Sequence, residues 1–242
     1  MSGGTLLGGR VRHDQPDSGH RTGIEPVLLA ASIPARPGER VLEGGTGSAA
    51  ALLCLAARVP GVGGVGVERD PAVADIARAN IAANGFAGIS VAAGDLTAMA
   101  WEGAFDHAFA NPPWHDAAGT ASPDAGKEAA RRAVPDVFAR WAARLAAPLR
   151  HRGTLTFVVA TAAMPLCLAA FAAAGCGSPA LLPLWPRAGV AARLVLLRGV
   201  KGGRAPFVLL PGLVLHAPDG RFTPDAEAIL RAGAPLPMAP PR

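Results

Sequence analysis

An apolar run near the middle of the chain ends abruptly in an amide, two prolines and a large aromatic ring. The run is AFA at 108–110, followed by Asn111, Pro112, Pro113 and Trp114. The prolines fix φ and lack an N–H group, so the turn is stiff and its carbonyl oxygens are not consumed by a helix. The Asn111 side-chain oxygen and the Pro112 carbonyl can then accept both hydrogens of an exocyclic or carboxamide nitrogen, a weak nucleophile. The motif predicts chemistry at a nitrogen, with Trp114 stacked on a flat substrate.

A glycine-rich motif, EGGTGSAA at 43–50, lies where a predicted strand meets a predicted helix. Gly45 and Gly47 allow a sharp turn and a close approach of the backbone to a ligand. The last glycine of a dinucleotide fingerprint is replaced here by Ala49. Glu68 ends the next predicted strand, roughly 20 positions after Gly47, where a carboxylate accepts hydrogen bonds from ribose hydroxyls. The pair of features predicts a nucleoside-containing ligand.

The charge of Glu43 distinguishes between two ligand classes. It immediately precedes the glycines, where it would repel a pyrophosphate but attract a sulfonium and an ammonium group. This favours S-adenosylmethionine over a dinucleotide. Asp95 ends the third predicted strand, where it would accept from an adenine amino group. The sequence contains no GxxxxGK[ST] motif, which excludes a P-loop nucleotide site.

Short β-like runs alternate with Ala-rich helical runs, which is typical of a parallel sheet covered by helices. The predicted strands are 40–43, 63–68, 89–93, 105–110, 153–160 and a weaker one at 181–185. The predicted helices are 48–58, 71–84, 128–149 with an interruption near Pro135, 162–174, and a short one within 222–233. Segments 191–200 and 206–216, separated by KGGR, are predicted to pair as an antiparallel hairpin.

From about His20 to Ala234 the chain resembles class I S-adenosylmethionine-dependent methyltransferases with an [N/D/S]PP[Y/F/W] motif. Within that group, HRTGIEPVLLAASIPARPGERVLEGGTG and FDHAFANPPW resemble the bacterial enzymes that methylate N6 of the adenine next to the anticodon of a valine tRNA. GLVLHAPDGRFTPDAEAILRAGAPL resembles the C-terminus of that family. The resemblance implies a Rossmann-like α/β fold with a seven-stranded, mostly parallel sheet and a C-terminal antiparallel hairpin.

The resemblance also implies that Arg21, Thr22 and Gly23 lie near the methionine end of the cofactor. The predicted cofactor-binding residues are therefore Arg21, Thr22, Gly23, Glu43, Gly45, Gly47, Glu68, Asp95 and Asn111. The predicted catalytic residues are Asn111, Pro112, Pro113 and Trp114. The chain departs from the family at Glu43, usually Asp, at Gly44, usually apolar, and at Ala49, usually Gly. We expect a flexible tail at 1–19, a single domain at 20–236 and a Pro-rich tail at 237–242.

Charge is divided unevenly along the chain. Residues 1–126 hold 8 Lys and Arg against 13 Asp and Glu, whereas residues 127–242 hold 15 against 5, within a net charge of +5. A basic half favours a polyanionic partner, and RNA, with tRNA foremost, fits the resemblance. The candidate phosphate contacts are Arg131, Arg132, Arg198, Lys201 and Arg204. A GC-rich genome is the alternative source of the arginines.

Two other functions fit the same motifs. Glutamine N5 methylation of release factors uses the same tetrapeptide, but those enzymes carry a long helical domain before the glycine loop, and only 42 residues precede Glu43. A methyltransferase-like fold that only binds RNA is the nonenzymatic alternative.

The remaining features narrow the class of protein. Neither HxxxH nor paired cysteines are present, so we expect no metal site, and the three cysteines are predicted to be buried free thiols. The longest apolar stretches are broken by prolines and arginines, which predicts a cytoplasmic protein without a membrane span. The sequence does not determine the oligomeric state.

Overall fold

The structure, a computed structural model, describes residues 2–16, 22–101, 104–113 and 125–238. Its strands are β1 (Ser2–Leu6), β2 (Val11–Gln15), β3 (Arg40–Gly44), β4 (Gly63–Glu68), β5 (Ile89–Ala93), β6 (Phe105–Ala110), β7 (Leu149–Ala160), β8 (Cys176–Arg187), β9 (Leu194–Lys201), β10 (Val208–Leu209) and β11 (Leu213–His216). Its α-helices are α1 (Glu25–Ser32), α2 (Ala50–Arg58), α3 (Pro71–Asn84), α4 (Ala125–Ala146), α5 (Met164–Ala173) and α6 (Pro224–Leu230), and 3-10 turns η1 (Leu7–Gly9) and η2 (Thr161–Ala163) complete the described elements.

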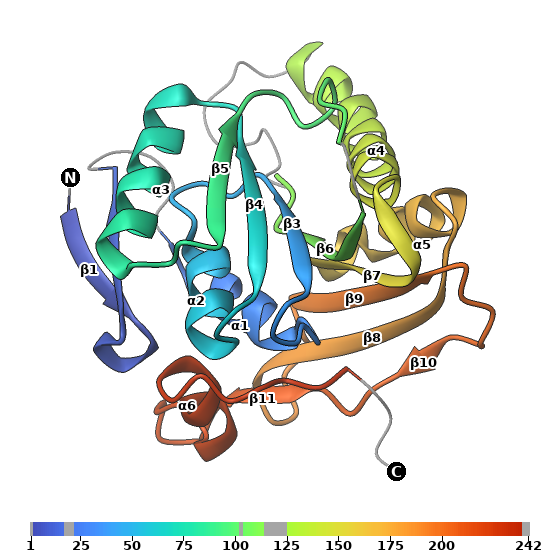
Figure 1. Ribbon diagram of the computed structural model, residues 1–242. Helices are drawn as coiled ribbons and strands as arrows, with labels where there is room; N and C mark the ends of the chain where they lie inside the picture. Colours follow the sequence, from blue (N-terminus) through green and yellow to red (C-terminus); the bar gives the residue numbers. More distant parts are fainter. Residues whose placement is uncertain (1, 17–21, 102–103, 114–124, 239–242) are drawn as a thin grey trace.

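The main sheet has nine strands in the order β10-β8-β9-β7-β6-β3-β4-β5, with β11 also paired to β8 (Figure 1). Strands β3 to β7 pair in parallel, and β9 runs antiparallel to both β7 and β8. The Rossmann-like class with a mostly parallel sheet and C-terminal antiparallel strands is confirmed. Strands β10 and β11 add to the predicted seven.

The composition of the C-terminal hairpin was predicted wrongly. Segment 206–216 does not pair with 191–200; its strands β10 and β11 pair in parallel with β8, and β9 pairs with β8 instead. Strand β8 runs over 12 residues and begins well before the weak strand expected at 181–185. Because β9 already has β7 and β8 on its two sides, it has no free edge for the last segment.

Two apolar cores enclose the sheet, one on each face. The first packs α1, α2, α3 and α6 against one side, and the second packs α4 and α5 against the other (Figure 1). Alternation along β6 shows the division, since Phe109 enters the first core while Ala108 and Ala110 enter the second. Burial of both faces explains why the parallel strands are continuous apolar runs.

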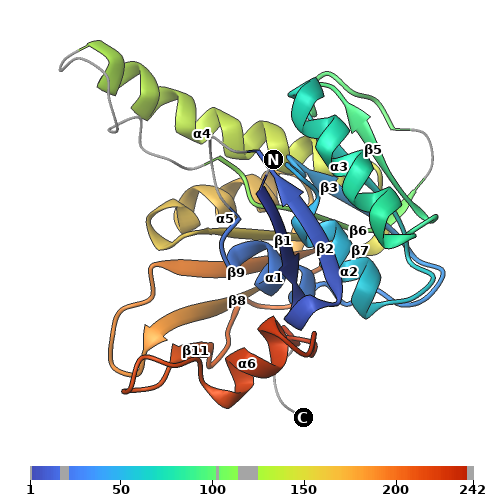
Figure 2. The ribbon, with the colours of Figure 1, turned by 90° about the vertical axis from the view of Figure 1, so that its left-hand side faces the viewer.

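The segment expected to be a flexible tail contains β1 and β2, an antiparallel pair in which Ser2 lies opposite Gln15. This pair lies beside α3 (Figure 2). Val11 and His13 point inward and are buried. The physical reason for the correction is that α3 offers side-chain amides to the backbone of β2, which supplies hydrogen bonds that the sequence pattern does not reveal.

Helix α4 runs through Pro135 without the predicted interruption. The cysteines Cys54, Cys167 and Cys176 are buried free thiols, as predicted. Among the described residues, no helix is long and apolar enough to cross a membrane. No group of described His, Cys, Asp or Glu side chains is arranged to hold a metal ion.

Candidate functional site

The carboxyl ends of β3, β4 and β6 bring the predicted motifs together. Glu43 lies opposite Phe109 of β6 and Gly66 of β4 in the parallel ladders. Asn111 therefore follows β6 at the same edge of the sheet where the glycine turn follows β3. This edge, at a point where the strand order reverses direction, is where α/β sheets bind ligands.

The glycine turn has left-handed backbone at three positions: Gly45, Gly47 and Ala49, with φ of 63°, 55° and 70°. A Cβ atom at Gly45 would lie 2.6 Å from the Trp141 ring, so only glycine fits there. Ala49 adopts a conformation that costs an L-residue about 1 kcal/mol. The departure from glycine at position 49 therefore leaves the turn intact at the cost of local strain.

Glu43 is buried at the base of this turn. Its carboxylate accepts a hydrogen bond from the Thr46 hydroxyl at 2.5 Å. Burial raises its pKa to about 8, while the bond from Thr46 lowers it. The Glu43 side chain is thus poised to ionise when a cationic group approaches.

The two other predicted acids hold backbone N–H groups. Glu68 accepts from Gly47 at 3.0 Å and from Asp70 at 2.9 Å, which ties the glycine turn to the end of β4. Asp95 is exposed and accepts from the N–H and hydroxyl of Thr97, and the bond from the N–H is the main cause of its lowered pKa. Both residues line the larger of two cavities at this edge of the sheet.

Two adjoining cavities follow this edge of the sheet and share Glu25, Gly45 and Asn111. The smaller, about 310 Å³, is lined by Pro16, Thr22, Gly23, Glu25, Pro26, Leu29, Glu43, Gly45, Thr46, Gly47, Ser48, Ala50, Ala51, Val73 and Asn111. The larger, about 480 Å³, is lined by Glu25, Gly45, Val67, Glu68, Arg69, Gly94, Asp95, Leu96, Thr97, Asn111, Pro112, Pro113, Val137, Arg140 and Trp141. Together they form a two-chambered cleft with acids in both chambers.

The predicted motif residues divide between the chambers. Thr22 and Gly23 line the smaller chamber with Glu43, and Pro112 and Pro113 line the larger with Glu68 and Asp95. Asn111 stands where the chambers meet. Arg21 and Trp114 lie outside the described residues, so their placement stays a prediction.

Sequence reasoning missed several side chains that line the cleft, and two of them contact its central parts. Glu25, in the first turn of α1, reaches both chambers, and Trp141 of α4 covers Gly45. The signal for Glu25 was its position directly before Pro26 at a helix start. Trp141 had no local signal, because its contact with the glycine turn depends on how α4 crosses the sheet.

Three of the basic candidates of the second half have described side chains, and one of these, Arg198, is not on the surface. Arg198 is only 8% exposed, and it donates to Thr156 and to the carbonyl of Ser32 at the end of α1. Its predicted role as a phosphate contact is therefore wrong, because its guanidinium is buried against the end of α1. Lys201 ends β9 at the edge opposite Asn111, and Arg204 follows it. The side chains of Arg131 and Arg132 lie outside the described part of α4.

The chemistry of the cleft fits S-adenosylmethionine. Two buried or half-buried acids, Glu43 and Glu25, suit a cationic amino acid end, while Glu68 and Asp95 suit the hydroxyl and amino donors of adenosine. With the antiparallel β9 inserted between β7 and β8, the fold and the cleft are those of a class I S-adenosylmethionine-dependent methyltransferase. A model of the methyltransferase small domain family matches residues 13–163. The chain belongs to this family.

Known relatives agree with this class. Over 115 residues the chain is 36% identical to tRNA1(Val) (adenine(37)-N6)-methyltransferases of two Porphyromonas gingivalis strains, and the match spans 42% of this chain and 44% of theirs. The match therefore covers less than half the length of these relatives.

Solved structures show the same fold at low sequence identity. Atu636 of Agrobacterium tumefaciens, described as a predicted O-methyltransferase, has a TM-score of 0.74 and 22% identity over 88% of this chain and 98% of its own. The S-adenosylmethionine-dependent O-methyltransferase TM0748 of Thermotoga maritima has a TM-score of 0.55 and 16% identity over 75% and 66%.

Proposed function

We propose that this protein methylates the exocyclic N6 atom of an adenine in tRNA. The observation that carries the proposal is the position of Asn111 where the two chambers meet, with Pro112 next to it in the larger chamber. The smaller chamber, lined by Glu43, would hold the methionine end of the cofactor, and the larger, lined by Glu68 and Asp95, would hold the adenosine. A nitrogen held at this junction would face the methyl donor. The Porphyromonas gingivalis relatives, named for the same chemistry, support the choice of acceptor.

The residues at the junction suit an amine acceptor. The side-chain oxygen of Asn111 and the carbonyl of Pro112 would accept the two N6 hydrogens, which favours pyramidal geometry and stabilises the positive charge that develops on nitrogen. Bound S-adenosylmethionine supplies an electrophilic methyl group on sulfur. No base is needed before transfer, because the amine proton can leave afterwards. Trp114, outside the described residues, is the proposed stacking partner of the adenine, worth about 1–3 kcal/mol.

The acceptor is tested by incubating the protein with methyl-labelled S-adenosylmethionine and separate pools of tRNA, ribosomal RNA and release factor. We expect label in tRNA, released on digestion as N6-methyladenosine. Label in release factor would establish the glutamine alternative, and saturable RNA binding without cofactor binding would establish the nonenzymatic one.

The variant Asn111→Ala tests the residue assignment in the same assay. Loss of the acceptor is expected to lower turnover by about 10²–10³-fold, the usual effect of removing one transition-state contact. Asn111→Asp keeps an oxygen acceptor and is expected to retain more activity than the alanine variant. Equal activity of both variants would show that this oxygen takes no part in the reaction.

A further inference from the structure

Strand β8 extends beyond the strand it pairs with. Its last partner in β9 is Leu194, opposite Leu184. Residues Trp185, Pro186 and Arg187 continue the strand past that point. A projecting strand end normally frays, so its order here requires another support.

Strand β11 supplies that support. Val214 lies opposite Trp185 and His216 opposite Arg187 in a parallel pairing. The ring of His216 donates to the Pro186 carbonyl at 3.1 Å, and the indole N–H of Trp185 donates to the Pro211 carbonyl at 3.0 Å. The strand end is therefore held by backbone and side-chain bonds.

The C-terminal helix fixes β11 in turn. His216 stacks on Phe222 with ring centroids 4.8 Å apart, and the hydroxyl of Thr223, the N-cap of α6, donates to the Val214 carbonyl at 2.6 Å. Residues 213–230 thus act as a brace for the end of β8.

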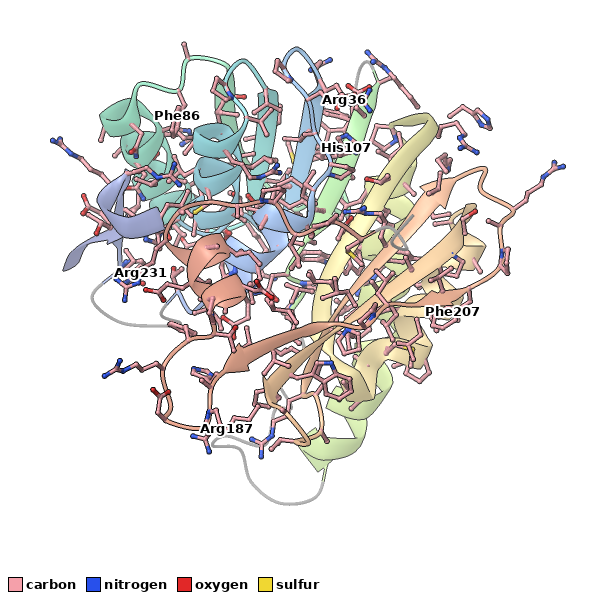
Figure 3. The ribbon with its side chains drawn as sticks, turned by 90° about the horizontal axis from the view of Figure 1, so that it is seen from below. Arg36, Phe86, His107, Arg187, Phe207 and Arg231 are labelled. Atoms are coloured by element: carbon pink, nitrogen blue, oxygen red, sulfur yellow. The ribbon has the colours of Figure 1, made fainter. Side chains whose placement is uncertain are left out.

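The turn at 187–193, which joins β8 to β9, lies at the catalytic edge of the sheet. Ala110, next to Asn111, pairs with Phe157 of β7, and Ala160, three residues further along β7, pairs with Leu194 of β9. With strands spaced about 4.8 Å apart, β9 lies only about 10 Å to the side of β6. This turn and α4 project from the same side of the molecule (Figure 2). In Figure 3, Arg187 lies at the opposite end of the molecule from Arg36 and His107.

The surface of this turn is basic and exposed. Arg187 and Arg193 flank it, both exposed, and Val190 at its tip is 47% exposed. None of the ion pairs formed among the described residues involves either arginine. Guanidinium groups bind phosphate through two parallel hydrogen bonds, and a pre-ordered arm loses little entropy on binding.

We propose that the braced turn at 187–193 is an arm that contacts RNA phosphates beside the cleft through Arg187 and Arg193. The inference rests on the proposed function and deepens it by assigning the RNA surface. It replaces the surface at the end of β9, where Lys201 and Arg204 lie at the opposite edge of the sheet.

The test compares two double charge reversals with the same change in net charge. Arg187→Glu/Arg193→Glu alters the arm, and Arg36→Glu/Arg204→Glu alters exposed arginines at the opposite edge. Binding of labelled tRNA is measured by fluorescence anisotropy over a series of salt concentrations. We expect the arm variant to bind at least about tenfold more weakly and to lose about two units of salt slope, one for each phosphate contact. The control is expected to stay within about twofold, since distant exposed charges are screened.

Melting temperature and cofactor affinity of each variant establish that the fold is retained. If the glutamate variant is misfolded, Arg187→Gln/Arg193→Gln replaces it with the same expected direction. Equal losses in both variants, no loss in the arm variant, or no tRNA binding by the unaltered protein would overturn the inference. The methyl-label assay separates the two proposals. If tRNA is labelled at adenine while the arm variant binds tRNA as well as the unaltered protein, only the arm is rejected. If release factor is labelled instead, the proposed function is rejected.

Discussion

His13 Nε2 lies 2.8 Å from the Ser48 hydroxyl oxygen, which joins the N-terminal strand pair to the glycine turn of the cleft. Both residues are buried, and burial lowers the pKa of His13. Asn80 of α3 completes the junction by donating to the carbonyls of Asp14 and Ser48, at 2.8 and 3.0 Å. Five predictions test the roles of this junction, of Glu43 and Glu68 in the cleft, and of the buried Arg198 guanidinium.

Replacement of Asn80 by leucine is expected to loosen the glycine turn. The change leaves the Asp14 N–H and two carbonyls without their partner in a buried place, which costs at least about 2 kcal/mol in the free energy of unfolding. Asn84→Leu is the matched control, because Asn84 makes the same pair of bonds to Arg12 where water can replace them. Urea unfolding and cofactor titration measure both variants. If both variants lose stability and cofactor affinity equally, the loss comes from the contact with β2 and not from the glycine turn.

The raised pKa of Glu43 predicts a pH dependence of stability. Burial raises the pKa of Glu43 in the folded state to about 8, above the ordinary value of 4.5 for a glutamate, so the neutral acid is favoured in the folded state. Its contribution to stability is present in full below about pH 4.5 and is lost as pH rises through 8. Between pH 5 and 8 the unaltered protein is expected to lose more stability than Glu43→Gln. Parallel unfolding curves of the two proteins over that range would contradict this assignment.

Cofactor binding provides a second test of the protonation of Glu43. If the cationic end of the cofactor lies beside Glu43, binding at pH 7 releases a proton from the carboxyl group. Calorimetry in buffers of different ionisation enthalpy detects that release. We expect it to disappear in Glu43→Gln, and its persistence would identify another group as the source.

Glu68→Ala is expected to weaken cofactor binding in two separable ways. The variant loses the acceptor of the Gly47 N–H, which is expected to lower the affinity of every ligand that contacts the glycine turn. It also loses the proposed ribose acceptor, which is expected to lower only the affinity of ligands that carry both ribose hydroxyls. We compare S-adenosylhomocysteine with its 2′-deoxyribose analogue by calorimetry. The unaltered protein is expected to prefer the ribose form by about tenfold or more, the usual value of a hydrogen bond to a charged group. If the variant keeps the same ratio of affinities for the ribose and 2′-deoxyribose ligands, Glu68 does not bind the ribose.

Arg198 is expected to stabilise the fold without touching RNA. Burial lowers the pKa of its guanidinium to about 10, and its main contact is the Ser32 carbonyl at the end of α1. Arg198→Met is expected to cost about 1.5–3 kcal/mol of unfolding free energy, as a charged hydrogen bond is lost, while the salt slope of tRNA binding is unchanged. If a fully folded variant shows a lower salt slope of tRNA binding, Arg198 contacts RNA after all.

The predictable part of the fold was local. Helix α3 begins at Pro71 and ends at Asn84, and Gly85, with φ of 70°, caps it; the sequence contains both signals. The site residues on described strands were also predictable. Glu43, Glu68 and Asn111 follow or end parallel strands, and such ends meet at one edge of a sheet whatever the side chains between them.

Apart from the helix interruption expected near Pro135, the errors concern which distant segments contact one another. The partner of 206–216 depends on which edge of the sheet remains open, and the burial of Arg198 depends on the approach of the end of α1 to its guanidinium. The Gly-rich N-terminus is held in place by distant residues, among them Asn80 and Asn84, which accept hydrogen bonds from the backbone of β2.

By itself the sequence determined the alternation of strands and helices, the glycine turn, the acids at the strand ends and the rigid NPP turn, because each depends on residues within one or two elements. The tertiary structure alone decided that Glu25 and Trp141 line the cleft, that Arg198 is buried and that Arg187 and Arg193 lie at the edge of the sheet that holds the cleft. Burial and proximity arise from contacts between segments far apart in the chain, and no local pattern records them.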